Sequence, residues 1–157
     1  MLVPLGEEHA GTQQDTTRGI RPRVVLVEDD LENRALLRQV LEAEGIEVLG
    51  EAGEGTEGVR IVRALHPDVV LMDLHMPGTG GIEATRPGHQ GGGPSQVIVL
   101  TAYDGPLPTR SAHEVGAYAY LVKGCSPALM RDVIVQAYGR CVALGRSAGA
   151  RGASRRA

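Results

Sequence analysis

The stretch that decides the fold is PDVVLMDLHMPG, at residues 67–78. Within it, the apolar run 69–72 has the length and the paired valines that are typical of a strand buried on both faces of a parallel sheet. Asp73 follows this run directly, and Pro77-Gly78 ends regular structure soon afterwards. Open α/β sheets bind their ligands at the carboxyl ends of the strands, so the pattern predicts that Asp73 lies at a ligand-binding edge. A solvated aspartate at a strand end is the alternative.

Strand and helix patterns alternate along the rest of the chain. Further strands are expected at 23–27, 46–51, 96–100 and 117–122, and helices at 31–44, 57–65, 80–86, 108–115 and 127–142. The second strand is the most polar, which suits an edge position. Alternation with short connections predicts a single α/β domain with a flavodoxin-like, doubly wound, five-stranded parallel sheet in the order 2-1-3-4-5.

The composition is that of one ordinary globular domain. The chain has 157 residues without Phe or Trp, so its core must be aliphatic. Cys125 and Cys141 fit no metal-binding spacing, which favours inert thiols in a reducing compartment. No apolar run reaches the roughly 20 residues of a membrane span, and the N-terminus does not resemble a secretion signal. A cytoplasmic protein without membrane contact is therefore expected.

The two ends of the chain differ in composition from its body. Residues 1–21 lack periodicity and are expected to form a disordered leader, whereas residues 22–142 are expected to form the domain. Residues 143–157 are expected to form a basic flexible tail, because they are rich in Gly, Ala and Ser and contain no aromatic residue for base stacking. From Arg140 onward there are five arginines and no acid. Nucleic-acid contact by this tail is the less favoured alternative.

Polar side chains stand at the ends of four predicted strands. Glu28 and Asp29 follow the first, Asp73 the third, Thr101 the fourth and Lys123 the fifth. These groups should converge at one sheet edge, where three carboxylates would repel each other unless a cation joined them. Oxygen ligands of this kind suit Mg²⁺, while a hydroxyl and an ammonium suit a phosphoryl group. The pattern predicts phosphorylation of Asp73 as an aspartyl phosphate.

Lys123 is the only lysine of the chain. We expect its ammonium either to hold a phosphate oxygen or to pair with Asp73 before modification, although a snorkelling surface lysine is the alternative. Thr101 is expected to move towards a new phosphate, and Tyr120 to follow it into the space that is left.

A rival interpretation is a nucleotide-binding α/β enzyme. Gly53, Gly55 and Gly58 match the pattern G-x-G-x-x-G after a strand, and Asp73 lies twenty residues beyond Gly53. This interpretation leaves the acidic pair and Lys123 without a role, and ordinary helix-start glycines explain the same pattern. A phosphatase with an aspartate nucleophile usually needs a second carboxylate two residues on, where His75 stands.

Four segments together identify a resemblance. The segments VVLVEDD, PDVVLMDLHMPGTGGIEA, VIVLTAY and GAYAYLVK resemble, in this order, a two-component response-regulator receiver domain over residues 22–142. They are most similar to receivers of helix-turn-helix transcription factors. Glu28 stands where Asp is commoner, Gly124 stands where Pro often follows the lysine, and the Gly/Pro-rich segment 87–94 shortens the third helix. The family tolerates Glu at the first position, and Gly124 excludes a cis-proline after the lysine. The segment 87–94 affects local packing rather than the acidic site.

The resemblance implies a role for each of these residues. Asp73 would be the phosphoacceptor, Thr101 and Tyr120 the switch pair, and Lys123 the lysine that contacts the phosphoryl group. Mg²⁺ would be held by the carboxylates of Glu28, Asp29 and Asp73 and by the backbone carbonyl of His75.

The resemblance also implies the partners and the output. A sensor histidine kinase would supply the phosphoryl group, and the protein would catalyse only its own phosphorylation and dephosphorylation. The switched face, formed by the fourth helix, fifth strand and fifth helix, would bind a partner or form a homodimer, and the domain itself would not bind nucleic acid. No helix-turn-helix pattern follows Val142, so a stand-alone receiver and a truncated transcriptional regulator both fit. A receiver-like protein that binds partners without phosphorylation would be expected to lack the acidic pair or the lysine.

Overall fold

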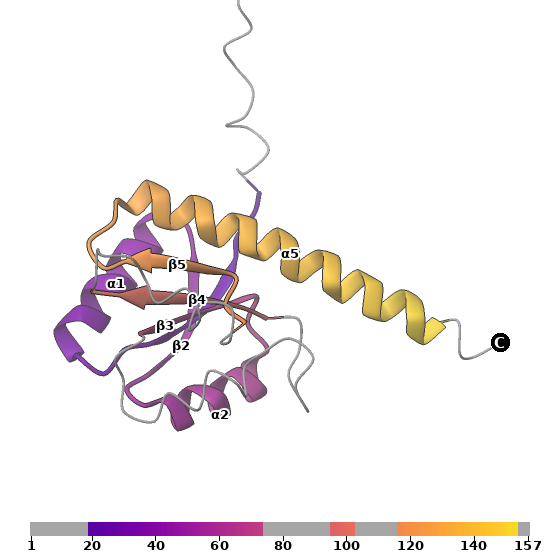
Figure 1. Ribbon diagram of the computed structural model, residues 1–157, viewed down its shortest axis with the longest axis horizontal. Coiled ribbons are helices and arrows are strands. Elements are labelled where there is room, and N and C mark those ends of the chain that lie inside the picture. The colour runs from indigo at the N-terminus through magenta and orange to yellow at the C-terminus, as the bar shows by residue number, and fades with distance from the viewer. Residues whose placement is uncertain (1–18, 74–94, 103–115, 154–157) are drawn as a thin grey trace, which may run out of the picture.

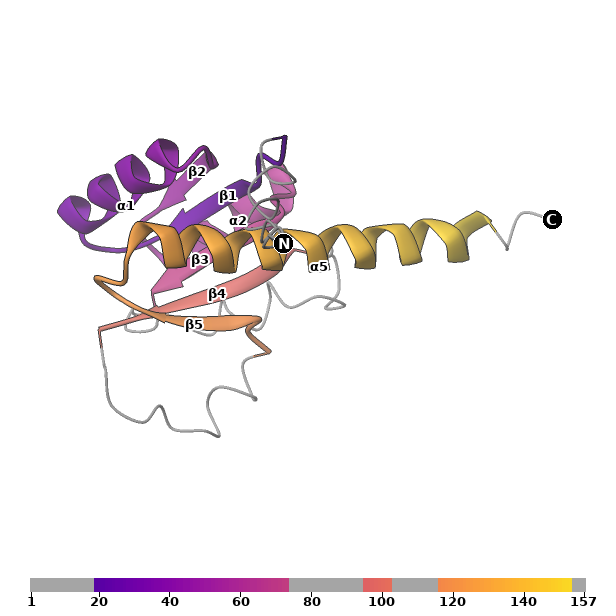
Figure 2. The same ribbon diagram turned by 90° about the horizontal axis from the view of Figure 1, so that it is seen from above.

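The structure, a computed structural model, describes residues 19–73, 95–102 and 116–153. Its centre is a single parallel sheet of five strands in the order β2-β1-β3-β4-β5, flanked by helices (Figures 1 and 2). The strands are β1 (Arg23–Val27), β2 (Glu47–Ala52), β3 (Val69–Asp73), β4 (Gln96–Thr101) and β5 (Ala119–Val122). The predicted strand order and the doubly wound α/β class are confirmed.

Two of the three described helices begin at residues suited to that place. Helix α1 (Leu31–Ala43) is capped by Asp30, whose Oδ1 accepts a hydrogen bond from the Asn33 N–H at 2.9 Å. It is followed by Gly45, whose φ of 79° is the left-handed conformation that glycine adopts readily. Helix α2 spans Gly55–Leu65. Helix α5 (Pro127–Ala153) starts with proline, as predicted.

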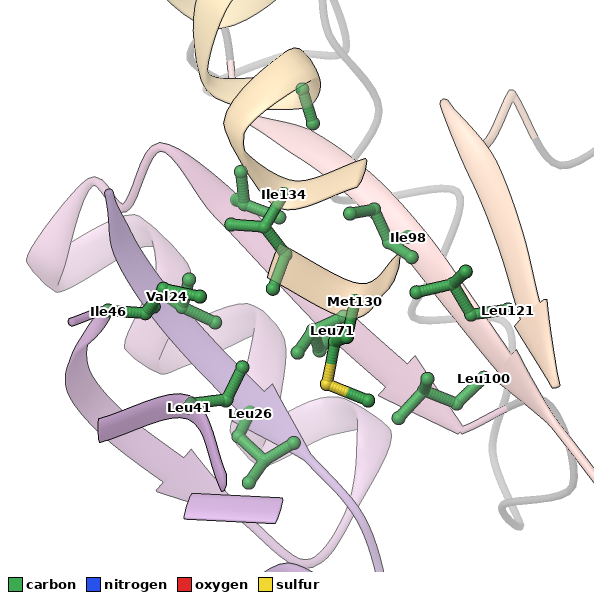
Figure 3. Packing of buried hydrophobic residues seen from close by; sticks show 12 residues of the cluster. Val24, Leu26, Leu41, Ile46, Leu71, Ile98, Leu100, Leu121, Met130 and Ile134 are labelled. Carbon is green, nitrogen blue, oxygen red and sulfur yellow. The ribbon is translucent and has the colours of Figure 1, made fainter. Parts of the chain in front are cut away.

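The helices cover both faces of the sheet. Helices α1 and α5 pack against one face and α2 against the other (Figures 1 and 2). On the α1 and α5 side, the core shown in Figure 3 consists of Val24, Leu26, Leu41, Ile46, Val69, Leu71, Ile98, Leu100, Leu121, Met130, Ile134 and Ala137. On the α2 side, it consists of Val25, Val27, Ala52, Val62, Val70, Met72, Val97 and Val99. Successive strand residues alternate between these clusters, so the central strands are buried on both faces as predicted.

Several boundaries differ from those predicted. Strand β5 begins at Ala119 rather than 117, and helix α2 begins at Gly55 rather than 57. Helix α5 continues to Ala153 and projects beyond the sheet (Figures 1 and 2), whereas the sequence predicted its end near Val142 and a flexible tail after it. The segment after Val142 contains no proline before Ala153, and its alanines and arginines favour helix, so the helix is not interrupted.

Other predictions lie outside the described residues. They are the helices at 80–86 and 108–115, the loop at 87–94, the first eighteen residues of the predicted leader, and the His75 carbonyl. None of the described helices is both long and apolar enough to cross a membrane.

Candidate functional site

The carboxyl edge of the sheet brings three acidic side chains together. Glu28 and Asp29 follow β1, and Asp73 is the last residue of β3, which pairs with β1 in parallel. One carboxylate oxygen from each of the three residues lies within 4.8 Å of the others. The convergence expected from the sequence is therefore present in the structure.

Lys123 places its ammonium between two of these carboxylates. Its Nζ donates hydrogen bonds to Asp73 Oδ2 at 3.0 Å and to Glu28 Oε1 at 3.2 Å. The second carboxylate oxygen of Glu28, Oε2, also lies 3.0 Å from Nζ. Because Lys123 directly follows β5, this arrangement ties the edge strand β5 to the ends of β1 and β3.

Burial determines the protonation chemistry of the site. Glu28 is completely buried and Asp73 is only 3% exposed. Desolvation raises the pKa of the Glu28 carboxyl, and the charge of Asp73 raises it further, although Lys123 acts in the opposite direction. Desolvation alone would lower the pKa of the Lys123 ammonium, but its hydrogen bonds to Glu28 and Asp73 outweigh this and raise it. The ammonium is therefore held in its charged form.

The donor set fits a hard divalent cation. Within the described part of the chain, Glu28 Oε2 is buried and accepts no hydrogen bond, despite its proximity to Nζ. The ion pair with Lys123 compensates part of the charge of this oxygen, and a further cation would complete its environment. With Asp29 and Asp73, Glu28 offers only oxygen ligands, which are the ligands that Mg²⁺ prefers.

The two predicted switch residues lie on neighbouring strands beside this cluster. Thr101 is buried at the end of β4, and its carbonyl accepts a hydrogen bond from the Lys123 N–H at 2.7 Å. Tyr120 lies one strand away in β5, opposite Val99, and packs against the core on the α2 side. Desolvation raises the pKa of the Tyr120 phenol. Thr101 is thus linked through the backbone to the residue that carries the ammonium.

Two of the three glycines behind the nucleotide-binding interpretation, Gly53 and Gly58, have local structural roles. A Cβ on Gly58 would lie 2.8 Å from Val27 Cγ2, so glycine allows α2 to approach β1 closely. The N–H of Gly53 donates to Glu57 Oε2 at 3.4 Å, and the side chain of Glu57 thereby occupies the loop. No observation in the described residues supports a nucleotide site there.

One contact at the site was not predicted from the sequence. Arg34, near the start of α1, donates a hydrogen bond from Nη1 to the Glu28 carbonyl oxygen at 2.9 Å. Its partner is a backbone atom, which every residue has, so neither residue type nor spacing indicates it.

Comparison with known proteins gives consistent matches. The response regulator receiver domain family matches residues 24–135. The response regulator GacA of Pseudomonas viridiflava is 40% identical over 114 residues, covering 71% of this chain and 53% of that protein. The transcriptional regulatory protein LiaR of Bacillus subtilis is 42% identical over 113 residues, covering 71% of this chain and 54% of that protein. The chain therefore spans about half the length of these relatives.

A solved structure agrees with these matches. A two-component response regulator of the LuxR family from Aurantimonas superposes with a TM-score of 0.66 at 35% sequence identity. The match covers 78% of this chain and 89% of that structure.

Proposed function

This chain belongs to the response regulator receiver domain family, and on that premise we propose that Asp73 accepts a phosphoryl group from a sensor histidine kinase in the cytoplasm. The observation that carries the proposal is the contact of Lys123 Nζ with Asp73 Oδ2 at 3.0 Å, beside the clustered carboxylates. The Asp73 carboxylate is a buried nucleophile that lies beside the Lys123 ammonium and beside oxygen atoms that can bind a cation. This arrangement suits phosphoryl transfer, which depends on positioning and charge neutralisation.

The transfer would use the side chains of this chain as follows. A carboxylate oxygen of Asp73 forms a bond to phosphorus, while the bond from phosphorus to the imidazole nitrogen of the kinase histidine breaks. The electron pair of that bond stays with the imidazole. The Lys123 ammonium then donates to a phosphoryl oxygen in place of Asp73 Oδ2. When bound by Glu28, Asp29, Asp73 and the His75 carbonyl, Mg²⁺ would neutralise charge on the phosphoryl oxygens.

The output would depend on Thr101 and Tyr120. The Thr101 hydroxyl would hydrogen-bond the new phosphate, and Tyr120 would move inward. Phosphorylation would shift a two-state equilibrium of the face formed by β5, α5 and the segment that joins β4 to β5. That face would then bind a partner or a second copy of the chain. If the chain is part of a longer transcriptional regulator, a DNA-binding output would lie outside this domain, whereas a stand-alone receiver would act through its partner alone.

The test is chemical phosphorylation with acetyl phosphate and Mg²⁺. Intact-protein mass spectrometry should show a gain of about 80 Da, the mass of one phosphoryl group. The gain should disappear in Asp73→Asn and persist in the matched control Asp132→Asn, since Asp132 is exposed on α5. An adduct that persists in Asp73→Asn, or that forms equally well in EDTA, would refute the proposal.

A further inference from the structure

Arg34 holds the peptide unit from which the acidic pair projects. Its Nη1 donates to the Glu28 carbonyl oxygen at 2.9 Å, and this carbonyl belongs to the peptide that joins Glu28 to Asp29. On the other side, the Glu28 N–H donates to the Ala52 carbonyl oxygen, at the end of β2, at 3.0 Å. Both backbone polar groups of Glu28 are therefore held. The guanidinium thus helps to orient the Glu28–Asp29 peptide, together with the Asp30 N–H, which donates to Glu28 Oε1 at 3.4 Å.

Asp29 depends on this peptide for its position. Its side chain is exposed and, within the described residues, makes no hydrogen bond or ion pair. The neighbours on either side are held differently: Glu28 contacts Lys123, and Asp30 caps α1 through Asn33. The orientation of the backbone is thus what aims the Asp29 carboxylate at the cluster.

The guanidinium packs closely against Gly53. A Cβ at residue 53 would lie 3.0 Å from Arg34 Nη1, which is tighter than most Cβ contacts, so the guanidinium would have to shift by a few tenths of an ångström. Arg34 also lines an open groove beside this loop with Arg60. The side chain of Arg60 is 80% exposed, and its Nη2 lies 4.0 Å from Glu57 Oε1. Arg60 therefore carries the same charge in the same groove, but it does not share the contact that Arg34 makes with the Glu28 carbonyl oxygen.

We propose that Arg34 is a positioning residue for Mg²⁺ at the acidic cluster, acting through the Glu28 carbonyl and the Asp29 backbone. This inference rests on the proposed function, in which the cluster holds Mg²⁺. Two physical effects of Arg34 have opposite signs. Its positive charge near a cation site would weaken Mg²⁺ binding, whereas its hydrogen bond would strengthen binding by pre-organising Asp29. Removal of the side chain abolishes both effects, so the sign of the change in Mg²⁺ affinity shows which of them is larger.

The experiment is calorimetric titration of the full chain with MgCl₂. Arg34→Met keeps most of the apolar stem but removes the donors. Mg²⁺ affinity should fall about threefold to tenfold, which is at or below the roughly 10–100-fold typical of residues that orient metal ligands, because the loss of the positive charge opposes the loss of the hydrogen bond. Arg60→Met is the matched control and should stay within about twofold of the wild type, because its charge is solvated and screened. At saturating Mg²⁺, the rate of phosphorylation by acetyl phosphate in Arg34→Met should recover, since the defect lies in binding.

A second variant tests the same contact without removing Arg34. Gly53→Ala should displace the guanidinium and weaken Mg²⁺ binding about twofold when Arg34 is present, and should have no effect in Arg34→Met. Gly53→Ala also tests the role of the Arg34 contact if Arg34→Met does not fold.

The outcomes are distinguishable. Unchanged or tighter Mg²⁺ binding in Arg34→Met would overturn the positioning role, as would a phosphorylation rate that stays low at saturating Mg²⁺. A wild-type chain that binds no Mg²⁺ would instead overturn the proposed metal site itself, and the role of Arg34 with it.

Discussion

Replacement of Lys123 by alanine should destabilise the protein when Mg²⁺ is absent. Its ammonium lies 3.0 Å from both Glu28 Oε2 and Asp73 Oδ2. Without it, two buried carboxylates would face each other beside Asp29 with no positive side chain between them. Removal of one partner from a buried ion pair is costly because it leaves an uncompensated charge.

The structure sets the size of this effect. A pair of unit charges at 3.0 Å attract with about 5.5 kcal/mol at an effective dielectric constant of 20. Desolvation of the ammonium opposes this attraction, and the Lys123 side chain is still 25% exposed, so solvent screens part of it. Disruption of fully buried pairs costs roughly 3–5 kcal/mol, and we therefore expect a loss of about 2–3 kcal/mol here.

The loss should depend on pH in a defined direction. The folded-state pKa of Lys123 is raised above its ordinary value of 10.5, so its contribution is present below that value and is lost as the pH rises through the folded-state pKa. The pKa of Glu28 is raised above 4.5, so ionised Glu28 destabilises the fold at neutral pH. Without Lys123 this penalty grows. The difference between wild type and Lys123→Ala should therefore be largest near neutral pH and should shrink when acid protonates Glu28.

The assay is urea unfolding in EDTA, followed by circular dichroism. Arg60→Ala is the matched control, because its exposed contact with Glu57 should contribute less than about 1 kcal/mol. Glu28→Gln in the Lys123→Ala background should recover part of the lost free energy of unfolding, since it removes one of the two repelling charges. If Lys123→Ala loses no more stability than Arg60→Ala, the ammonium does not compensate the buried carboxylates.

Two further substitutions test the elements that support the site. Gly58→Ala should lower the free energy of unfolding by about 1–3 kcal/mol in urea unfolding, because its Cβ would lie 2.8 Å from Val27 Cγ2. The control Gly139→Ala, in a helical position with open space, should be neutral or stabilising. Equal effects of the two substitutions would contradict the explanation that Gly58 allows α2 to approach β1 closely. Asp30→Ala should lower the free energy of unfolding by about 1 kcal/mol, because the Asn33 N–H loses its cap. Asp30→Asn should keep most of the stability, because its side-chain oxygen can still accept this hydrogen bond. Equal losses in the two variants would contradict the capping role.

The sequence predicted the sheet and the meeting of the acidic residues because both follow from strand patterns. Buried apolar runs end at Val27 and Met72, and the two strands are parallel. The residues that follow, Glu28 and Asp73, therefore lie at the same edge of the sheet, and this does not depend on the conformation of the loops. The end of α5 was predicted wrongly because no proline marks it, and the glycines and alanines that follow Val142 are compatible with either helix or coil. The convergence of Lys123 with the acidic residues could be predicted, but its contact with both oxygens of Glu28 could not, because side-chain reach is set by packing.

One lysine is not sufficient to neutralise the negative charge of the site. Three clustered carboxylates face one ammonium, so the fully ionised site has a net negative charge in a place where Glu28 and Asp73 are almost completely buried. Lys123 contacts two of the three, and the Oε2 atom of Glu28 still accepts no hydrogen bond within the described residues. Either a proton on Glu28 or a second cation can relieve the remaining repulsion. The raised pKa of Glu28 and the proposed binding of Mg²⁺ therefore have the same physical cause.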